Sequence, residues 1–342
     1  MADSLGKKNI TWESVKVKSD DGFTLTVFHL TGDENGPWTT SKSSVVFTSG
    51  LGGDSREFTA TLPMSGEKPM AYQLGALGYD VWLANNSAAL YSKEHDKYTA
   101  DDREYWEMDW QKYGIYDTPA VVTEIQKRNG GKKVGYIGHS QGTSQVLAGM
   151  GIIPEWYDKN ISTAVLLGPC VIPNEKYFHA YSKESWDFLN EHEIWAIGNS
   201  EGPSWDDNLA LINAEGPQEL KDIMNAVKDM VDVPVQAVAA FAQTSHSKRF
   251  MRYNPNWFEE ENPKAPLMDY GLVREMKVAM FVGLWDNTCP VTYAQQMYEN
   301  FGGEKTVTDW IVHPMHGHVP WGFANSSWFM DKLTTALDRN TN

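Results

Sequence analysis

The sequence predicts an α/β fold, in which helices flank a mostly parallel central sheet and a mainly helical cap is inserted. Three observations predict this fold. Short apolar runs typical of strands alternate with helical patterns, as in a doubly wound sheet. Most of these runs lack apolar–polar alternation, as expected for strands buried on both faces. The rhythm stops between about residues 174 and 266 and then resumes.

The chain opens with a hairpin pattern. Residues 15–30 alternate apolar and polar side chains around an Asp21-Gly22 turn, which is a hairpin signal. Later runs predict strands at residues 45–47, 79–83, 134–137, 163–167, 278–284 and 307–312.

Helix signals lie between these strands. Asp117 suits an N-cap and Pro119 the first turn of a helix. This helix is expected to run towards Lys127 and to stop near the glycines at 130 and 131. A second helix is expected at residues 143–150, directly after a glycine turn.

The middle of the chain predicts the cap. Apolar residues recur at helical spacing between 220 and 231, and a second helical run starts at Pro234 and reaches Gln243. We therefore expect residues 1–173 and 267–342 to form the α/β core and residues 174–266 to form the inserted cap. The alternative is a separate second domain.

Charge and composition limit the partners. The net charge of −16 disfavours binding to nucleic acid, because an acidic surface repels phosphate groups. The same charge also has a simpler explanation, which is solubility. No apolar stretch is long enough to span a membrane. The polar first twelve residues lack a signal-peptide core, which predicts a cytoplasmic protein, or a secreted or lysosomal one whose leader has been removed.

The two cysteines, Cys170 and Cys289, both end apolar runs. Buried free thiols are common at such positions. A secreted chain of this size could instead join them in one disulfide. The residues alone leave both alternatives open.

Ser140 is the candidate nucleophile. Residues 138–142 read Gly-His-Ser-Gln-Gly, with an apolar strand before them and a helical pattern after them. This is the setting of a nucleophile elbow, in which the serine stands on a strained strand-to-helix turn. The two glycines are needed because side chains there would collide in the turn. The alternative is an ordinary turn with a capping serine.

Two backbone N–H groups must then face the oxyanion that forms during acyl transfer. One is expected from Gln141, the residue after the nucleophile, and the other from a loop after an early strand. The glycine-rich stretch at residues 49–53 is that loop. Leu51 is the predicted donor, and Gly52 is the alternative.

A serine needs a base, and the base needs an orienting carboxylate. After such an elbow the acid and the histidine follow in that order. Asp286 comes just after the strand at 278–284, at the edge that carries Ser140, whereas Asp309 lies inside the next strand. The loop after that strand holds three candidate bases, which the residues alone do not separate: His313, His316 and His318. His139 points elsewhere on an elbow and is not assigned as the base.

The chain resembles the acid lipase family of α/β-hydrolases, which includes gastric and lysosomal acid lipases. The resemblance covers nearly the whole chain and rests on residues 21–25, 78–86, 105–110, 116–120, 138–142, 241–243 and 250. The chain departs from the family at residues 49–51, which read Ser-Gly-Leu where the family has His-Gly-Leu. It also departs after Asn86 and around the histidine at 318.

The resemblance implies an enzyme that hydrolyses neutral lipid esters, either triacylglycerols or steryl esters, through an acyl-enzyme. It implies Ser140, Asp286 and His318 as the triad, with Leu51 and Gln141 as oxyanion donors. It also implies a cap with a mobile lid over an apolar acyl pocket. We expect the cap to contact lipid interfaces transiently, and we expect the reaction to need no metal and no cofactor. The alternatives are a catalytically degenerate relative that serves as a structural or binding protein, and a thioesterase or acyltransferase.

Overall fold

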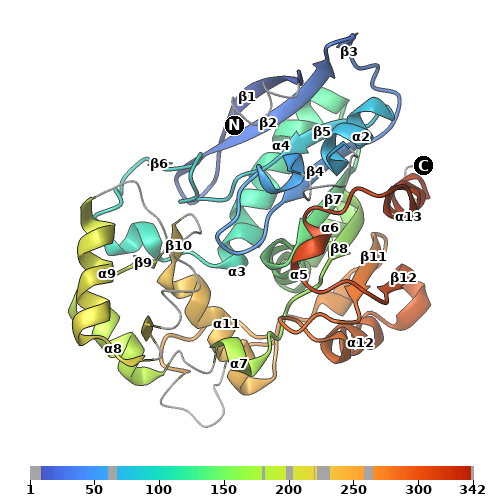
Figure 1. Cartoon of the computed structure of the whole chain (residues 1–342). Helices are drawn as coiled ribbons and strands as arrows, with labels where there is room; N and C mark the ends of the chain where they lie inside the picture. The colour runs from blue at the N-terminus through green and yellow to red at the C-terminus, as the bar shows by residue number, and fades with distance from the viewer. Residues whose placement is uncertain are drawn as a thin grey trace.

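The central sheet has the strand order β1-β2-β5-β4-β7-β8-β11-β12 in a computed structural model, with β4, β5, β7, β8, β11 and β12 parallel (Figure 1). The structure describes residues 9–60, 68–178, 182–197, 203–218, 220–221, 232–257 and 265–339. The strands of this path are β1 Thr11–Lys18, β2 Phe23–Asp33, β4 Ser44–Thr48, β5 Asp80–Leu83, β7 Val134–His139, β8 Ile161–Leu167, β11 Lys277–Gly283 and β12 Val307–His313. Two short strands, β3 Gly36–Pro37 and β6 Glu94–His95, pair with β2.

The predicted hairpin and the predicted strands are confirmed. β1 and β2 pair antiparallel around the turn after Lys18. Each predicted parallel strand overlaps an observed one, with ends that differ by at most two residues. β4, β7 and β8 are buried on both faces. Val45 and Phe47 contribute to one core cluster, and Val46 contributes to the cluster on the other face.

Helices cover both faces of the sheet and so complete the three layers. The cluster that contains Val46 takes side chains from α4 Thr118–Asn129, α5 Gln141–Ile152, α6 Pro154–Asn160 and α12 Val291–Asn300. The cluster that contains Val45 takes them from α2 Met70–Ala76 and α13 Ser327–Asp338. The fold class expected from the sequence is therefore confirmed, and the carboxyl ends of the parallel strands meet at one edge.

The N-cap expected at Asp117 is wrong. A helical turn, η3 Tyr113–Asp117, leads directly into α4, so Asp117 already has helical backbone angles. Its carboxylate accepts hydrogen bonds from the backbone N–H and the hydroxyl of Ser87 instead. The other end of α4 lies where it was predicted, because Gly130 ends the helix with a left-handed φ of 76°.

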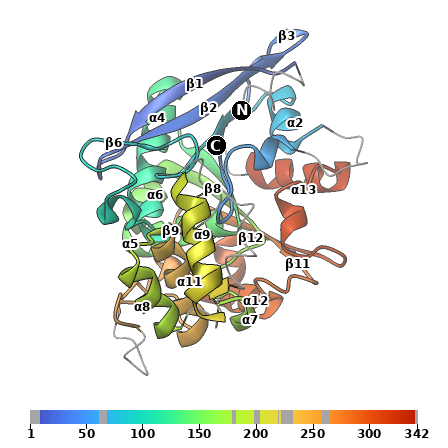
Figure 2. The same cartoon turned by 60° about the vertical axis from the view of Figure 1, so that its left-hand side comes forward.

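The segment expected to form the cap is mainly helical where it is described. It contains α7 Glu175–Phe178, α8 Lys183–Glu191, α9 Pro203–Glu215 and α11 Val235–Ser247, with β9 Ala196–Ile197 and β10 Val233–Pro234 (Figures 1 and 2). The helical run predicted from Pro234 is confirmed by α11. The helix predicted between 220 and 231 lies almost entirely outside the described residues.

This segment has an apolar cluster of its own, which includes Leu189, Ile212 and Val238. Leu51 packs against both this cluster and the main core. The division into a core and an inserted cap stays a prediction.

The other helical elements that the structure describes are η1 Glu57–Thr59, η2 Arg103–Trp106, α3 Trp110–Lys112, η5 Tyr270–Leu272, η6 Gly303–Lys305 and η7 Val319–Trp321. Among the described residues, no helix has the length and apolarity that crossing a bilayer requires.

Candidate active site

Ser140 stands at a sharp bend between β7 and α5. Its backbone angles are φ 52° and ψ −114°, a conformation that L-residues rarely adopt. The two flanking glycines make the bend possible. A Cβ at Gly138 would lie 2.7 Å from the backbone of Gly142, and one at Gly142 would lie 2.4 Å from the carbonyl oxygen of Thr48. The backbone therefore has the geometry that the elbow motif predicts.

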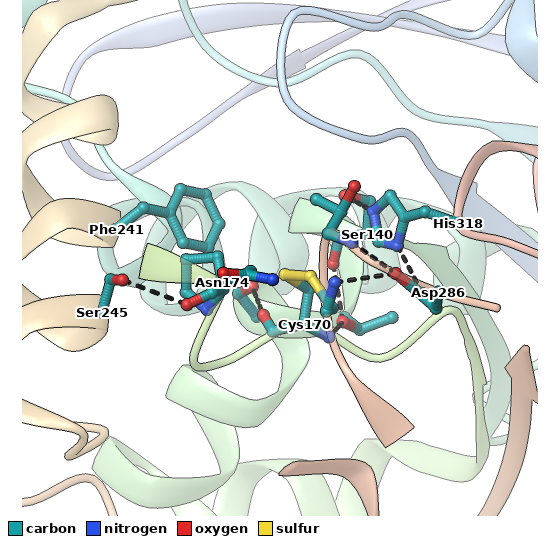
Figure 3. Close-up of a disulfide and its surroundings, with 12 residues drawn as sticks. Ser140, Cys170, Asn174, Phe241, Ser245, Asp286 and His318 are labelled. Carbon is teal, nitrogen blue, oxygen red and sulfur yellow. Dashed lines mark hydrogen bonds and ion pairs between the residues drawn. A yellow bond between two sulfur atoms is a disulfide. The ribbon is translucent and has the colours of Figure 1, made fainter. Parts of the chain in front are cut away.

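Three side chains from distant parts of the sequence form a hydrogen-bonded chain at this bend (Figure 3). The distance from His318 Nε2 to Ser140 Oγ is 2.7 Å, and that from His318 Nδ1 to Asp286 Oδ2 is also 2.7 Å. The structure thus brings together the three residues proposed from the sequence. A ring nitrogen that faces the serine oxygen can accept its proton, and a carboxylate at the other nitrogen fixes the tautomer.

The loop after β11 holds Asp286 firmly. The carboxylate is buried, and its second oxygen accepts hydrogen bonds from the backbone N–H groups of Thr288 and Cys289 at 3.0 and 2.7 Å. Both oxygens are therefore engaged, one by this loop and one by His318. Gly168, with a φ of 56°, lies beside the imidazole, and a Cβ there would be 3.3 Å from Nδ1 of His318.

A disulfide between Cys170 and Cys289 lies next to this hydrogen-bonded chain (Figure 3). It joins the loop after β8 to the loop that holds Asp286, and both cysteines are buried. The N–H of Cys170 donates to Thr143 Oγ1 in the first turn of α5. The alternative that the sequence left open is therefore resolved in favour of the bridge.

The other acidic and histidine candidates do not reach Ser140. Asp309 lies in β12 and forms an ion pair with Arg339. The rings of His313 and His316 contact each other at a tilt of 34°, and their centroids are 3.6 Å apart. Burial, together with His313, lowers the pKa of His316 to about 4. Of the three histidines, only His318 contacts the serine.

The predicted oxyanion donors line one small pocket. Leu51 and Gln141 border this pocket together with Gly50, Gly52 and other residues that include Tyr113, Val233 and Pro234. The loop at 49–53 also touches the nucleophile, since a Cβ at Gly50 would be 3.2 Å from Cβ of Ser140. The loop and the first turn of α5 therefore both face the space beside the serine.

Sequence reasoning missed the contacts of His139 and its partner Glu57. The Nδ1 atom of His139 forms an ion pair with Glu57, and Nε2 lies 3.1 Å from the carbonyl oxygen of His318. Burial alone would lower the pKa of His139, but the carboxylate of Glu57 raises this pKa above its usual value. No sequence motif marks Glu57, because its ion-pair partner His139 lies far away in the chain.

Within the described residues, the one cluster with metal-ligand chemistry is Cys170, Cys289 and His318. The two sulfurs are bonded to each other and the imidazole is hydrogen-bonded to Asp286. These groups therefore serve structure and hydrogen bonding here.

Sequence comparisons identify similar proteins. Residues 44–193 match the alpha/beta hydrolase fold family. Gastric triacylglycerol lipase from Bos taurus is 34% identical over 133 residues, which cover 39% of this chain and 33% of the relative. Lipase 1 from Drosophila melanogaster is 30% identical over 165 residues, which cover 48% and 35%, respectively. The chain thus matches about a third of the length of these curated relatives.

Solved structures share the fold. The alpha/beta hydrolase GrgF from Penicillium sp. sh18 has a TM-score of 0.59 at 12% identity, with 97% of this chain and 99% of that chain covered. A soluble variant of monoglyceride lipase from Saccharomyces cerevisiae has a TM-score of 0.58 at 12% identity, with 97% of both chains covered. The chain has the α/β-hydrolase fold and resembles the acid lipases, as the sequence predicts.

Proposed function

We propose that this chain, an acid lipase-like member of the α/β-hydrolases, is a serine hydrolase that cleaves neutral lipid esters through an acyl-enzyme. The observation that carries the proposal is the hydrogen-bonded chain from Ser140 through His318 to Asp286. In the proposed reaction, Ser140 Oγ bonds to the ester carbonyl carbon while His318 Nε2 takes its proton. The Asp286 carboxylate holds the tautomer and stabilises the imidazolium.

The negative charge that develops on the carbonyl oxygen needs donors that are already in place. The proposed donors are the backbone N–H groups of Leu51 and Gln141, which border the same pocket beside the serine. When the tetrahedral intermediate collapses, the alcohol leaves with the proton from His318. Water then loses a proton to the same nitrogen as it attacks the acyl carbon. When this second intermediate collapses, the bond to Ser140 Oγ breaks, His318 returns the proton to that oxygen, and the fatty acid is released.

The substrate class follows from the relatives and from the side chains beside the site. Triacylglycerols or steryl esters are proposed because similar proteins include triacylglycerol lipases. The residues next to Asp286 and His318 in the sequence include exposed apolar side chains, namely Leu284, Trp285, Met315 and Val319, which are 52–76% exposed. An apolar rim of this kind suits contact with a neutral lipid phase.

The disulfide bears on the compartment. Bridges of this kind persist in oxidising environments and are rare in the cytosol. The Cys170–Cys289 bridge therefore favours a secreted or lysosomal location over the cytoplasmic one that the first twelve residues predict.

Labelling with a fluorophosphonate probe, combined with a panel of acyl esters, tests the proposal. The wild type is expected to be labelled at Ser140 and to hydrolyse p-nitrophenyl acyl esters and emulsified triacylglycerol. The Ser140→Ala variant should fold normally, resist the probe and lose about 10⁶-fold in turnover. A folded wild type that the probe does not modify would identify a degenerate, non-catalytic relative. Preferential transfer to thiol or alcohol acceptors, or cleavage of thioesters alone, would identify an acyltransferase or a thioesterase.

A further inference from the structure

We propose that Glu57 is a positioning residue that holds the oxyanion loop, the nucleophile elbow and the base in one arrangement. This inference rests on the proposed ester hydrolysis at Ser140. Glu57 begins η1, four residues after the loop at 49–53, and its side chain is largely buried. It touches none of the reacting atoms, so it would act through the groups that it holds.

Each oxygen of the Glu57 carboxylate binds a different segment. Oε2 accepts a hydrogen bond of 3.0 Å from the backbone N–H of Gly50. Oε1 faces Nδ1 of His139, the residue directly before the nucleophile. One carboxylate therefore fixes the loop that carries Leu51 to the elbow that carries Ser140.

His139 extends this link to the base. Its Nε2 lies 3.1 Å from the backbone carbonyl oxygen of His318, and the two rings are 5.3 Å apart. A carbonyl oxygen can only accept, so Nε2 must carry a proton. The link thus runs from residue 57 through 139 to 318 and joins three segments that are distant in the sequence.

The number of protons on the two ring nitrogens of His139 indicates an ion pair between Glu57 and His139. Nδ1 faces a carboxylate oxygen, so a proton must lie between these two atoms. Because Nε2 is also protonated, the pair is an imidazolium beside a carboxylate, or a neutral ring beside a carboxylic acid. The raised pKa of His139 favours the imidazolium. Two buried partners of opposite charge are each costly alone, so the loss of one disturbs the other.

Two glycines pack against the carboxylate of Glu57. A Cβ at Gly322 would lie 2.1 Å from Oε1 of Glu57, and one at Gly53 would lie 3.1 Å from Oε2. Gly322 comes just after η7, the turn that follows His318. The segment after the base therefore packs directly onto Glu57. This close contact leaves the carboxylate little freedom to move away from Gly50 and His139.

Steady-state kinetics on a soluble p-nitrophenyl ester tests this role. Glu57→Ala removes both links, and a site misplaced by about 1 Å loses roughly 100-fold in rate. We expect that loss in kcat with little change in KM, because the Glu57 side chain does not itself line the pocket that the proposed oxyanion donors border. Glu57→Gln is expected to recover most of the loss, since its amide oxygen can accept from Gly50 and its NH₂ group can donate to His139.

Arg56→Ala is the matched control. Arg56 lies in the same turn and pairs with the buried Asp54, without contact to Gly50 or His139. This variant should lose stability, measured by thermal unfolding, but should keep kcat. If Arg56→Ala lowers kcat as much as Glu57→Ala does, or if Glu57→Gln is no better than Glu57→Ala, the positioning role is refuted.

A double-mutant cycle covers the case in which Glu57→Ala does not fold. Glu57→Met keeps the volume of the side chain but cannot pair with His139. Glu57→Met, His139→Asn and the double variant should give effects on kcat that are not additive, because the two residues share one link. Additive effects would overturn the proposal. A wild type that neither turns over esters nor reacts with the probe would instead refute the proposed function, so the two failures are distinguishable.

Discussion

Removal of the Cys170–Cys289 bridge is expected to lower both stability and turnover. The double variant Cys170→Ala, Cys289→Ala leaves the chain without cysteine, since these two are its only cysteines. The bridge joins the loop of the proposed acid to the loop that contacts the first turn of α5. Cys289 donates its N–H to Asp286, and Cys170 donates its N–H to Thr143.

The expected stability change follows from the length of the closed loop. The two cysteines are 119 residues apart in the sequence. The chain-entropy relation then gives about 5 kcal/mol at 25 °C, towards the upper end of measured disulfide effects. The free energy of unfolding of a typical domain is about 5–15 kcal/mol. The bridge therefore accounts for a third or more of that stability, and its loss is expected to lower the urea midpoint markedly.

Urea unfolding followed by tryptophan fluorescence measures this change. The double variant should unfold at a lower urea concentration, and dithiothreitol should move the wild type in the same direction. Dithiothreitol added to the double variant is the control and should have no effect. The reasoning is refuted if thiol titration of the unfolded, unreduced wild type finds two free thiols, or if the variant and the wild type share one midpoint. Activity should also fall, because the loop that holds Asp286 is released.

Three further outcomes are expected. His318→Ala should lose about 10⁶-fold in turnover, whereas His316→Ala should keep most of its activity; the reverse order in an ester assay would mean that the base is misassigned. Burial raises the pKa of Asp117, so the folded state keeps a proton that the unfolded chain releases as pH rises above about 4. Asp117→Asn should therefore be more stable than the wild type at pH 7 and similar to it near pH 3. Parallel profiles of unfolding free energy against pH for the two proteins, measured by chemical denaturation, would contradict this. Met315→Glu should impair hydrolysis of emulsified triacylglycerol while a soluble ester is still cleaved. Leu77→Glu, at another exposed apolar position, is the control and should be unaffected. Equal losses of Met315→Glu on both substrates would argue against lipid contact at the apolar rim around Met315.

The sequence was sufficient to predict the layers of the fold because strand and helix signals are local. A run such as 45–47 is apolar without interruption, and in the structure β4 is buried on both faces. Gly130 ends α4 for a reason that is also local, namely its left-handed φ. The N-cap at Asp117 was wrong because tertiary contacts decided it. The carboxylate binds Ser87, thirty residues away in the chain, and the helix continues upstream.

The three side chains proposed as the triad could be named because chain order and sheet geometry constrain them. Parallel strands end at the same edge of a sheet, so residues after β7, β11 and β12 converge there. The choice among His313, His316 and His318 came from the family resemblance, since spacing treats all three alike. The sequence could not decide between free thiols and a disulfide for a similar reason. Whether two apolar-run cysteines meet depends on which strands are neighbours, and β8 and β11 are adjacent only in the folded sheet.

The contacts of Glu57 follow from tertiary packing and could not be predicted from the sequence around it. Nothing in its local sequence marks it, yet in the structure it binds Gly50 and His139 and packs against Gly322. Each of these three contacts is ordinary on its own. Their combination matters because Ser140 holds a strained φ of 52°, and strained backbone persists only when its surroundings fix it from several sides. The elbow glycines allow the bend, whereas the buried Glu57–His139 pair and the disulfide hold the loops around it. We infer that the reacting groups follow from local motifs and that their alignment depends on these long-range links.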